Sequence, residues 1–112
     1  MTITYLFAGI PVSDRDKAAA WYSNLFAAEP MYPNDNEAMW QVVGTGSLYV
    51  IVDPNAGAGT VTLIVDDLDA TLVELRGRGV DIADPILIEG AGRKSLARDP
   101  DGNQVWFVGL FS

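Results

Sequence analysis

The sequence contains neither cysteine nor histidine. The absence of cysteine excludes disulfides, zinc sites with thiolate ligands and thiol nucleophiles. The absence of histidine removes the commonest metal ligand and the commonest general base at neutral pH. A conventional site for a divalent metal would therefore have to be built from aspartate and glutamate alone.

Positive charge is also scarce, since 7 Lys and Arg stand against 15 Asp and Glu, a net charge of −8. This balance opposes nucleic-acid binding, which needs cations to displace counterions from phosphates. It is typical of a solvated acidic surface and would also favour a cationic small ligand. No apolar run approaches the roughly 20 residues of a membrane span, and the first residues lack the features of a signal peptide. The sequence predicts a cytoplasmic protein that binds neither nucleic acid nor membranes.

A short phrase of the sequence occurs twice, as Val12–Asp16 and again as Val65–Asp69. In both places an apolar run precedes the phrase and an apolar stripe at helical spacing follows it. Such a repeat in a chain of 112 residues indicates two copies of one supersecondary unit within a single domain. We expect module one over about 1–53, a joint over 54–59 and module two over about 60–112.

Each module has the pattern of a strand, a helix and three further strands. In module one, Ser13 and Asp14 offer a helix N-cap, and Ser13 with Asp16 resembles a capping box. In module two, Asp66 is the expected cap. The expected strands are 3–12, 29–33, 37–43 and 47–53, then 60–65, 81–88, 93–98 and 104–111, with one helix after the first strand of each module. The pattern predicts an α+β fold with the helices on one face of the sheet.

Three segments, in this order and at this spacing, resemble the vicinal oxygen chelate superfamily of glyoxalase I, bleomycin-resistance proteins, fosfomycin-resistance enzymes and extradiol dioxygenases. They are Val12-Ser13-Asp14 with Ala18 and Trp21-Tyr22, the helix exit Leu75–Val80, and Arg98–Asn103 before the last strand. The resemblance implies two β-α-β-β-β modules in the glyoxalase/bleomycin-resistance fold, a curled mixed sheet around a cleft with helices on its outer face. It also implies a homodimer, often with clefts between subunits, and in the enzymes a divalent metal held by His and Glu.

The positions at which this resemblance places metal ligands carry Phe7, Thr60 and Trp106, with Tyr49 at the fourth to within about one residue. None of these side chains is an ordinary ligand of a divalent metal, which prefers imidazole, carboxylate or thiolate. We therefore predict that this chain has lost the metal, needs no cofactor and has no catalytic residue at these positions.

Because side chains alternate between the two faces of a strand, Tyr5 is expected on the same side as Phe7, and Thr62 on the same side as Thr60. An aromatic pocket with a few hydroxyls suits a flat organic ligand, and aromatic faces also attract cations. We expect Ser95 as a further polar group of the cleft. Residues of the opposite strand parity, Leu6, Ile10, Val52 and Phe107, are expected to lie under the helices. The predicted ligand-binding cleft consists of Tyr5, Phe7, Tyr49, Thr60, Thr62 and Trp106.

Three functional interpretations follow from these residues. The first is a metal-free protein that binds a small aromatic or cationic molecule, as antibiotic-sequestering members of the bleomycin-resistance type do. The second is a glyoxalase-like lyase or isomerase that uses carboxylates such as Glu37 or Glu89. The third is a ligandless dimerisation or accessory module in which Phe7 and Trp106 fill a closed core. Arg93 and Lys94 either reach an anionic ligand or form a solvated strand edge.

Overall fold

Two four-stranded sheets and two helices make up the computed structural model, which describes residues 1–112. The first half of the chain contains β1 (Leu6–Val12), α1 (Arg15–Phe26), β2 (Met31–Asn34), β3 (Glu37–Val43) and β4 (Gly46–Val52). The second half contains β5 (Thr60–Val65), α2 (Leu68–Gly77), β6 (Ile86–Ile88), β7 (Gly92–Arg98) and β8 (Gln104–Leu110).

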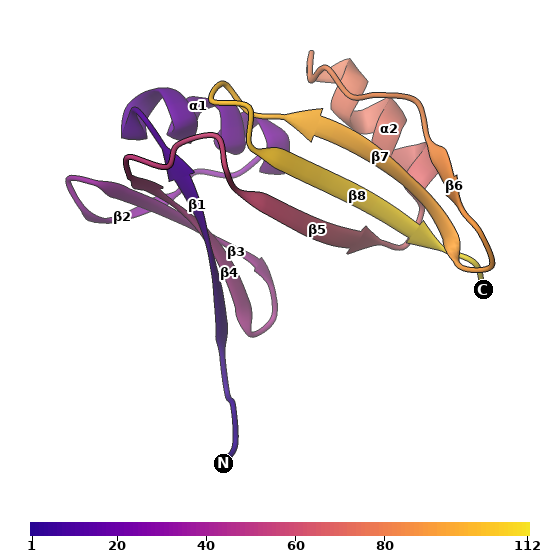
Figure 1. The fold of residues 1–112 in the computed structure, drawn as a ribbon, viewed down its shortest axis with the longest axis horizontal. Coiled ribbons are helices and arrows are strands. Elements are labelled where there is room, and N and C mark those ends of the chain that lie inside the picture. Colours follow the sequence, from indigo (N-terminus) through magenta and orange to yellow (C-terminus); the bar gives the residue numbers. More distant parts are fainter.

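The two sheets have the same topology. Their strand orders are β1-β4-β3-β2 and β5-β8-β7-β6. In each sheet the first strand pairs in parallel with the last, and the remaining pairs are antiparallel. This repetition confirms the predicted α+β fold of two β-α-β-β-β modules. The two sheets diverge from a common junction and are not closed into one sheet (Figure 1).

Both helices begin at an aspartate. The carboxylate of Asp14 accepts a hydrogen bond from the amide of Lys17 at 3.0 Å, and Asp67 accepts one from Ala70 at 3.0 Å. Each satisfies a backbone donor that has no partner inside the helix. The expectation that Asp66 caps the second helix is wrong by one residue. Ser13 does not act as a cap either, because its hydroxyl donates to Asp101.

Two expected strands are shorter than the sequence pattern suggested. The strand expected over 3–12 begins at Leu6, which pairs with Gly46 at the start of β4. The strand expected over 81–88 is reduced to β6, preceded by an isolated bridge at Ile82. Pro85 lies between them and has no backbone N–H to donate, which explains the interruption of the ladder.

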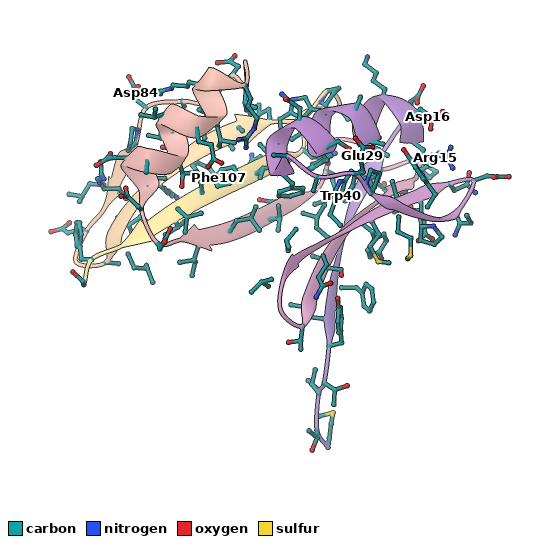
Figure 2. All side chains as sticks on the ribbon, turned by 180° about the vertical axis from the view of Figure 1, so that it is seen from behind. Arg15, Asp16, Glu29, Trp40, Asp84 and Phe107 are labelled. Carbon is teal, nitrogen blue, oxygen red and sulfur yellow. The ribbon has the colours of Figure 1, made fainter.

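The core is shared by both modules and lies between the helices and the sheets. It is a cluster of 18 buried residues that includes Ile10 and Phe107, as the strand parity predicted. Figure 2 shows Trp40 beneath α1 and Phe107 beside α2. The prediction that Leu6 and Val52 are also buried under the helices is wrong. Both are exposed, because each lies at the end of its strand.

The modules are joined by the turn that precedes β8. The side-chain nitrogen of Asn103, Nδ2, donates to the carbonyl oxygen of Pro11 at 2.7 Å and to the carboxylate of Asp99 at 2.8 Å. Its amide oxygen accepts from the backbone of Gly59 at 2.7 Å. A Cβ atom at Gly59 would lie 2.8 Å from the Pro11 ring, so only glycine fits this close approach. This fully buried asparagine therefore fixes the start of β5 beside the end of β1.

A second set of contacts joins the two helices at their C-terminal ends. The guanidinium of Arg78 donates to the carbonyl oxygens of Asn24 at 2.8 Å and Leu25 at 2.7 Å. In return, the Asn24 side chain donates to the carbonyl of Arg78 at 3.0 Å. These bonds hold the last turn of α1 against the end of α2. Neither helix has the length and apolar character that crossing a membrane requires.

Candidate ligand-binding site

Three predicted site residues lie together on the first sheet, on the side away from α1. The rings of Tyr5 and Phe7 are 4.8 Å apart between centroids, and the Tyr5 hydroxyl lies 2.7 Å from the hydroxyl of Ser47. Ser47 pairs with Phe7 in the sheet, and Tyr49 follows it on the same face. We call Tyr5, Phe7 and Tyr49 the aromatic face. Phe7 is 54% exposed, so this face is open in the single chain.

A glycine makes room for one ring of the aromatic face. Gly9 pairs with Tyr49, and a Cβ atom at Gly9 would lie 2.6 Å from the Cζ and hydroxyl oxygen of that ring. The Tyr49 ring therefore lies directly over the glycine backbone. Since no other residue type leaves this space, Gly9 determines where the phenol can lie.

The other three predicted residues lie on the second sheet. Thr62 pairs with Trp106, and Thr60 pairs with Gln104, which accepts a 3.0 Å hydrogen bond from the Trp106 indole. The ammonium of Lys94 lies 4.5 Å from the centroid of the Trp106 ring. We call Thr60, Thr62 and Trp106 the tryptophan face. Trp106 is half-buried and both threonines are exposed.

The structure brings the predicted residues together in two groups of three. The sheets that carry the aromatic face and the tryptophan face diverge from the module junction (Figure 1). Tyr5 and Phe7 contact each other, whereas Trp106 forms no contact with another aromatic ring. A single ligand-binding surface made of all six residues is therefore not formed within one chain.

Two neighbouring residues belong to the core and not to these faces. Ser95 pairs with Phe107 on the helix side of the second sheet, where it is 1% exposed and its hydroxyl lacks a partner. Its expected place as a polar point of the cleft is wrong, because its neighbour Lys94 occupies the face of Trp106. Trp40 is buried and packs on Tyr22 with ring centroids 5.7 Å apart.

A hollow lies between the modules and is lined mainly by residues of β3 and β5. Its volume is about 540 Å³, and nine of its eleven lining residues are hydrophobic. Of the six predicted site residues only Thr62 lines it. The largest side chains around it are Phe26, Trp40 and Phe107. Its size and apolar character are typical of small-ligand sites, so it is a second location that experiments on binding must distinguish.

The residues present do not fit a divalent metal. Phe7, Tyr49, Thr60 and Trp106 offer one phenol, one hydroxyl and no carboxylate. Nowhere in the structure do three or more His, Cys, Asp or Glu side chains form a group that could hold a metal ion. Glu37 on β3, which pairs with Ile51 on β4, belongs to no such group.

The sequence model of the glyoxalase/bleomycin resistance protein/dioxygenase superfamily matches residues 3–107. The chain belongs to this superfamily. The membership confirms the resemblance that the repeated phrase and the last turn suggested. No curated protein matches the chain in sequence.

Solved structures of the superfamily cover almost the whole chain. A glyoxalase/bleomycin resistance protein from Catenulispora acidiphila DSM 44928 is 41% identical, with a TM-score of 0.87 over 97% of this chain and 100% of that one. TnmS3, described as an antibiotic binding protein from Streptomyces sp. CB03234, is 27% identical, with a TM-score of 0.80 over 99% of both chains. A bleomycin-binding protein complexed with bleomycin shares the fold at 22% identity, with a TM-score of 0.75 over 97% of this chain and 98% of that one.

Two contributors to the aromatic face, Gly9 and Ser47, were missed in the sequence. Lys94, which the sequence offered either as a contact for an anionic ligand or as part of a solvated strand edge, covers Trp106. The alternation that placed Phe7 and Tyr49 also places Gly9 on their side, so that signal was available. The position of Lys94 depends on how β7 pairs with β8, which periodicity alone does not give.

Proposed function

We propose that this protein is a metal-free member of the superfamily that binds a small aromatic or cationic molecule. The observation that carries the proposal is the exposed aromatic face. Large aromatic side chains on an exposed strand surface are costly to solvate unless a ligand or a partner covers them. By the resemblance, Phe7 stands where the superfamily's enzymes carry a metal ligand, and Tyr49 does so to within about one residue, which supports binding without Lewis-acid chemistry.

An antibiotic is the ligand type that the comparisons favour. TnmS3, which is 27% identical, is described as an antibiotic binding protein. Sequestration of an antibiotic needs affinity but no catalytic residue, and this agrees with the absence of a paired acid and base on either face. The cytoplasmic location expected from the sequence stays a prediction.

We also propose that two copies associate and complete the site. The aromatic face and the tryptophan face lie on diverging sheets, so each offers half of a ligand-binding surface. Leu6 and Phe7 are 67% and 54% exposed, which favours burial against a second copy or a ligand. Sedimentation equilibrium at micromolar concentration should give twice the mass of the chain. A mass equal to one chain, with or without a bound ligand, would exclude this assembly.

The binding proposal can be tested by thermal shift on protein purified without an affinity tag. The probes are bleomycin, naphthamide, an α-oxoaldehyde–thiol adduct, and manganese, nickel and zinc salts. A ligand that binds only the folded state raises the melting temperature by mass action. We expect an organic probe to raise it. If the metals raise it and no organic probe does, the proposal fails.

Variants can show whether the aromatic face carries the binding. Phe7→Ala should weaken binding of the organic probe about tenfold while changing stability by less than about 1 kcal/mol, because the ring is exposed. Phe111→Ala is the matched control, since Phe111 is 57% exposed and lies beyond β8. Equal weakening by both variants would argue against a site on the aromatic face.

Tryptophan fluorescence can distinguish the tryptophan face from the hollow between the modules. Trp106 lies on the tryptophan face, and Trp40 lines the hollow. If the ligand binds on the tryptophan face, quenching should disappear in Trp106→Phe and persist in Trp40→Phe. The reverse result would place the ligand in the hollow.

The thiol adduct also tests an enzymatic function. Turnover of the adduct that is lost in Glu37→Gln would favour the glyoxalase-like lyase or isomerase over a binding protein. Glu37 is the half-buried carboxylate on the side of the sheet that carries Tyr49. Absence of turnover together with binding of bleomycin or naphthamide supports the proposal.

A further inference from the structure

The ammonium of Lys94 is a cation without a carboxylate partner, held against the ring of Trp106. Its nitrogen lies 4.5 Å from the ring centroid and takes part in no salt bridge. Arg93, the preceding residue, points to the other side of the sheet and pairs with Asp69 at 3.1 Å. Adjacent residues of β7 thus place one neutralised cation against α2 and one free cation beside the tryptophan face.

The strand residues around Lys94 bring no negative charge to this face. Cross-strand partners on β7 and β8 share a side, so Lys94 lies beside Val108, Leu96 beside Trp106, and Arg98 beside Gln104. The residues that β5 adds to the same side are Thr60, Thr62 and Ile64. Asp81 lines a small hollow together with Leu96 and Arg98. In a chain of net charge −8, this face is locally positive.

A ligand that stacks on Trp106 has to take the place that the lysine ammonium now occupies. The four-carbon stem of a lysine is flexible, so the ammonium can move to the rim of a bound ring. A ligand carrying an anionic group would then pair with the displaced ammonium. A cationic ligand would lose the attraction that Lys94 already has for the ring and would add a like charge beside it.

We propose that Lys94 makes the tryptophan face selective for planar aromatic ligands that carry an anionic oxygen group, such as a carboxylate or a phenolate. The inference rests on the proposed binding function and deepens it, because it decides between ligands of opposite charge. The acidic composition alone suggested a cation. The local charge of this face points the other way, and local charge acts at contact distance whereas the charge of the rest of the surface is screened by salt.

The test uses three probes with one ring system and different charge, namely naphthoate, naphthamide and naphthylmethylammonium, titrated into the whole protein by calorimetry. For the unmodified chain we expect naphthoate to bind most tightly and the ammonium probe least tightly. Lys94→Met should weaken naphthoate about fivefold or more and leave naphthamide unchanged or tighter. Lys94→Arg should keep the preference for naphthoate. Lys17→Met, an exposed lysine on α1, is the matched control and should change none of the three affinities.

The outcomes separate this inference from the proposed function. If the three probes bind equally, if the ammonium probe binds best, or if Lys94→Met binds naphthoate as tightly as the unmodified chain, the role of Lys94 is wrong while aromatic binding stands. If none of the three probes binds at millimolar concentration, the proposed aromatic ligand and the role of Lys94 both fail.

Discussion

The hydroxyl of Tyr22 on α1 donates a 2.9 Å hydrogen bond to Oδ2 of Asp99, in the turn before β8. The two residues belong to different modules, and both are buried. The other oxygen of Asp99 accepts from the backbone of Asp101 at 3.0 Å and of Asn103 at 2.9 Å. A buried carboxylate without a cation is thus stabilised by donors from both halves of the chain. This bond ties the first helix to the turn that joins the modules.

Removing the Tyr22 hydroxyl should destabilise the fold. Tyr22→Phe keeps the ring that packs on Trp40 and removes one of the two side-chain donors to Oδ2 of Asp99, the other being Asn103. Hydrogen bonds to charged groups contribute about 1.5–3 kcal/mol, and we expect a loss in that range in urea unfolding. Tyr5→Phe is the control and should cost less than about 1 kcal/mol, because Tyr5 is 38% exposed and water can replace its bond to Ser47. Equal costs for the two variants would contradict this account.

Stability should fall at alkaline pH because of the same tyrosine. Burial, and after it the carboxylates of Asp99 and Asp101, raise the pKa of Tyr22 well above its usual value of 10.0. The unfolded chain releases this proton near pH 10 while the folded chain keeps it. The contribution is therefore complete below about pH 10 and is lost above it, by about 1.4 kcal/mol per pH unit.

The pH effect can be isolated by comparing the unmodified chain with Tyr22→Phe in urea unfolding at about pH 9, 10 and 11. All other residues are the same in the two proteins, so their contributions to the pH dependence cancel in the difference. The stability advantage of the unmodified chain should be constant up to about pH 10 and should shrink above it. An advantage that stays constant to about pH 11 would show that Tyr22 ionises normally in the folded state.

Gly9→Ala should impair ligand binding more than it impairs folding. The added methyl group would meet the tip of the Tyr49 ring at 2.6 Å and force the ring away from its place on the aromatic face. Because the ring is the free end of a flexible side chain, the stability cost should stay within about 1.5 kcal/mol. Affinity for naphthamide, measured by calorimetry, should drop about fivefold.

A matched glycine controls for the substitution itself. Gly44 lies in the turn between β3 and β4, and a Cβ atom there meets nothing within 4 Å. Gly44→Ala should leave both stability and naphthamide affinity unchanged. If Gly9→Ala binds naphthamide as well as Gly44→Ala does, Tyr49 has no part in binding.

Divalent metals should leave the stability of the tag-free protein unchanged. A metal present at 100 times its Kd would add about 2.7 kcal/mol to the free energy of unfolding, which raises the melting temperature by several degrees. For manganese, nickel and zinc we expect shifts of less than about 1 °C, because the four positions carry no carboxylate or imidazole. A rise of several degrees with one metal ion bound per chain would overturn the metal-free interpretation.

The local features of the modules could be predicted because they depend on neighbouring residues. The repeated phrase gave two modules, and the alternation of the strands placed Ile10 and Phe107 in the core. Errors of one residue arose where two acids compete for one cap, as at Asp66 and Asp67. The strand before β7 was predicted too long, because the cost of Pro85 to a ladder depends on which of its neighbours pair.

The sequence by itself determined the duplicated β-α-β-β-β unit and the resemblance to the superfamily, and it carries the prediction that the metal is lost, since each follows from residue types at fixed spacing. Only the tertiary structure decided that the six predicted site residues form two separate faces, that Ser95 belongs to the core and that Lys94 lies over Trp106. These facts depend on sheet register and on the angle between the modules. Asn103, Arg78 and the bond from Tyr22 to Asp99 set that angle through contacts between residues 53 to 92 positions apart.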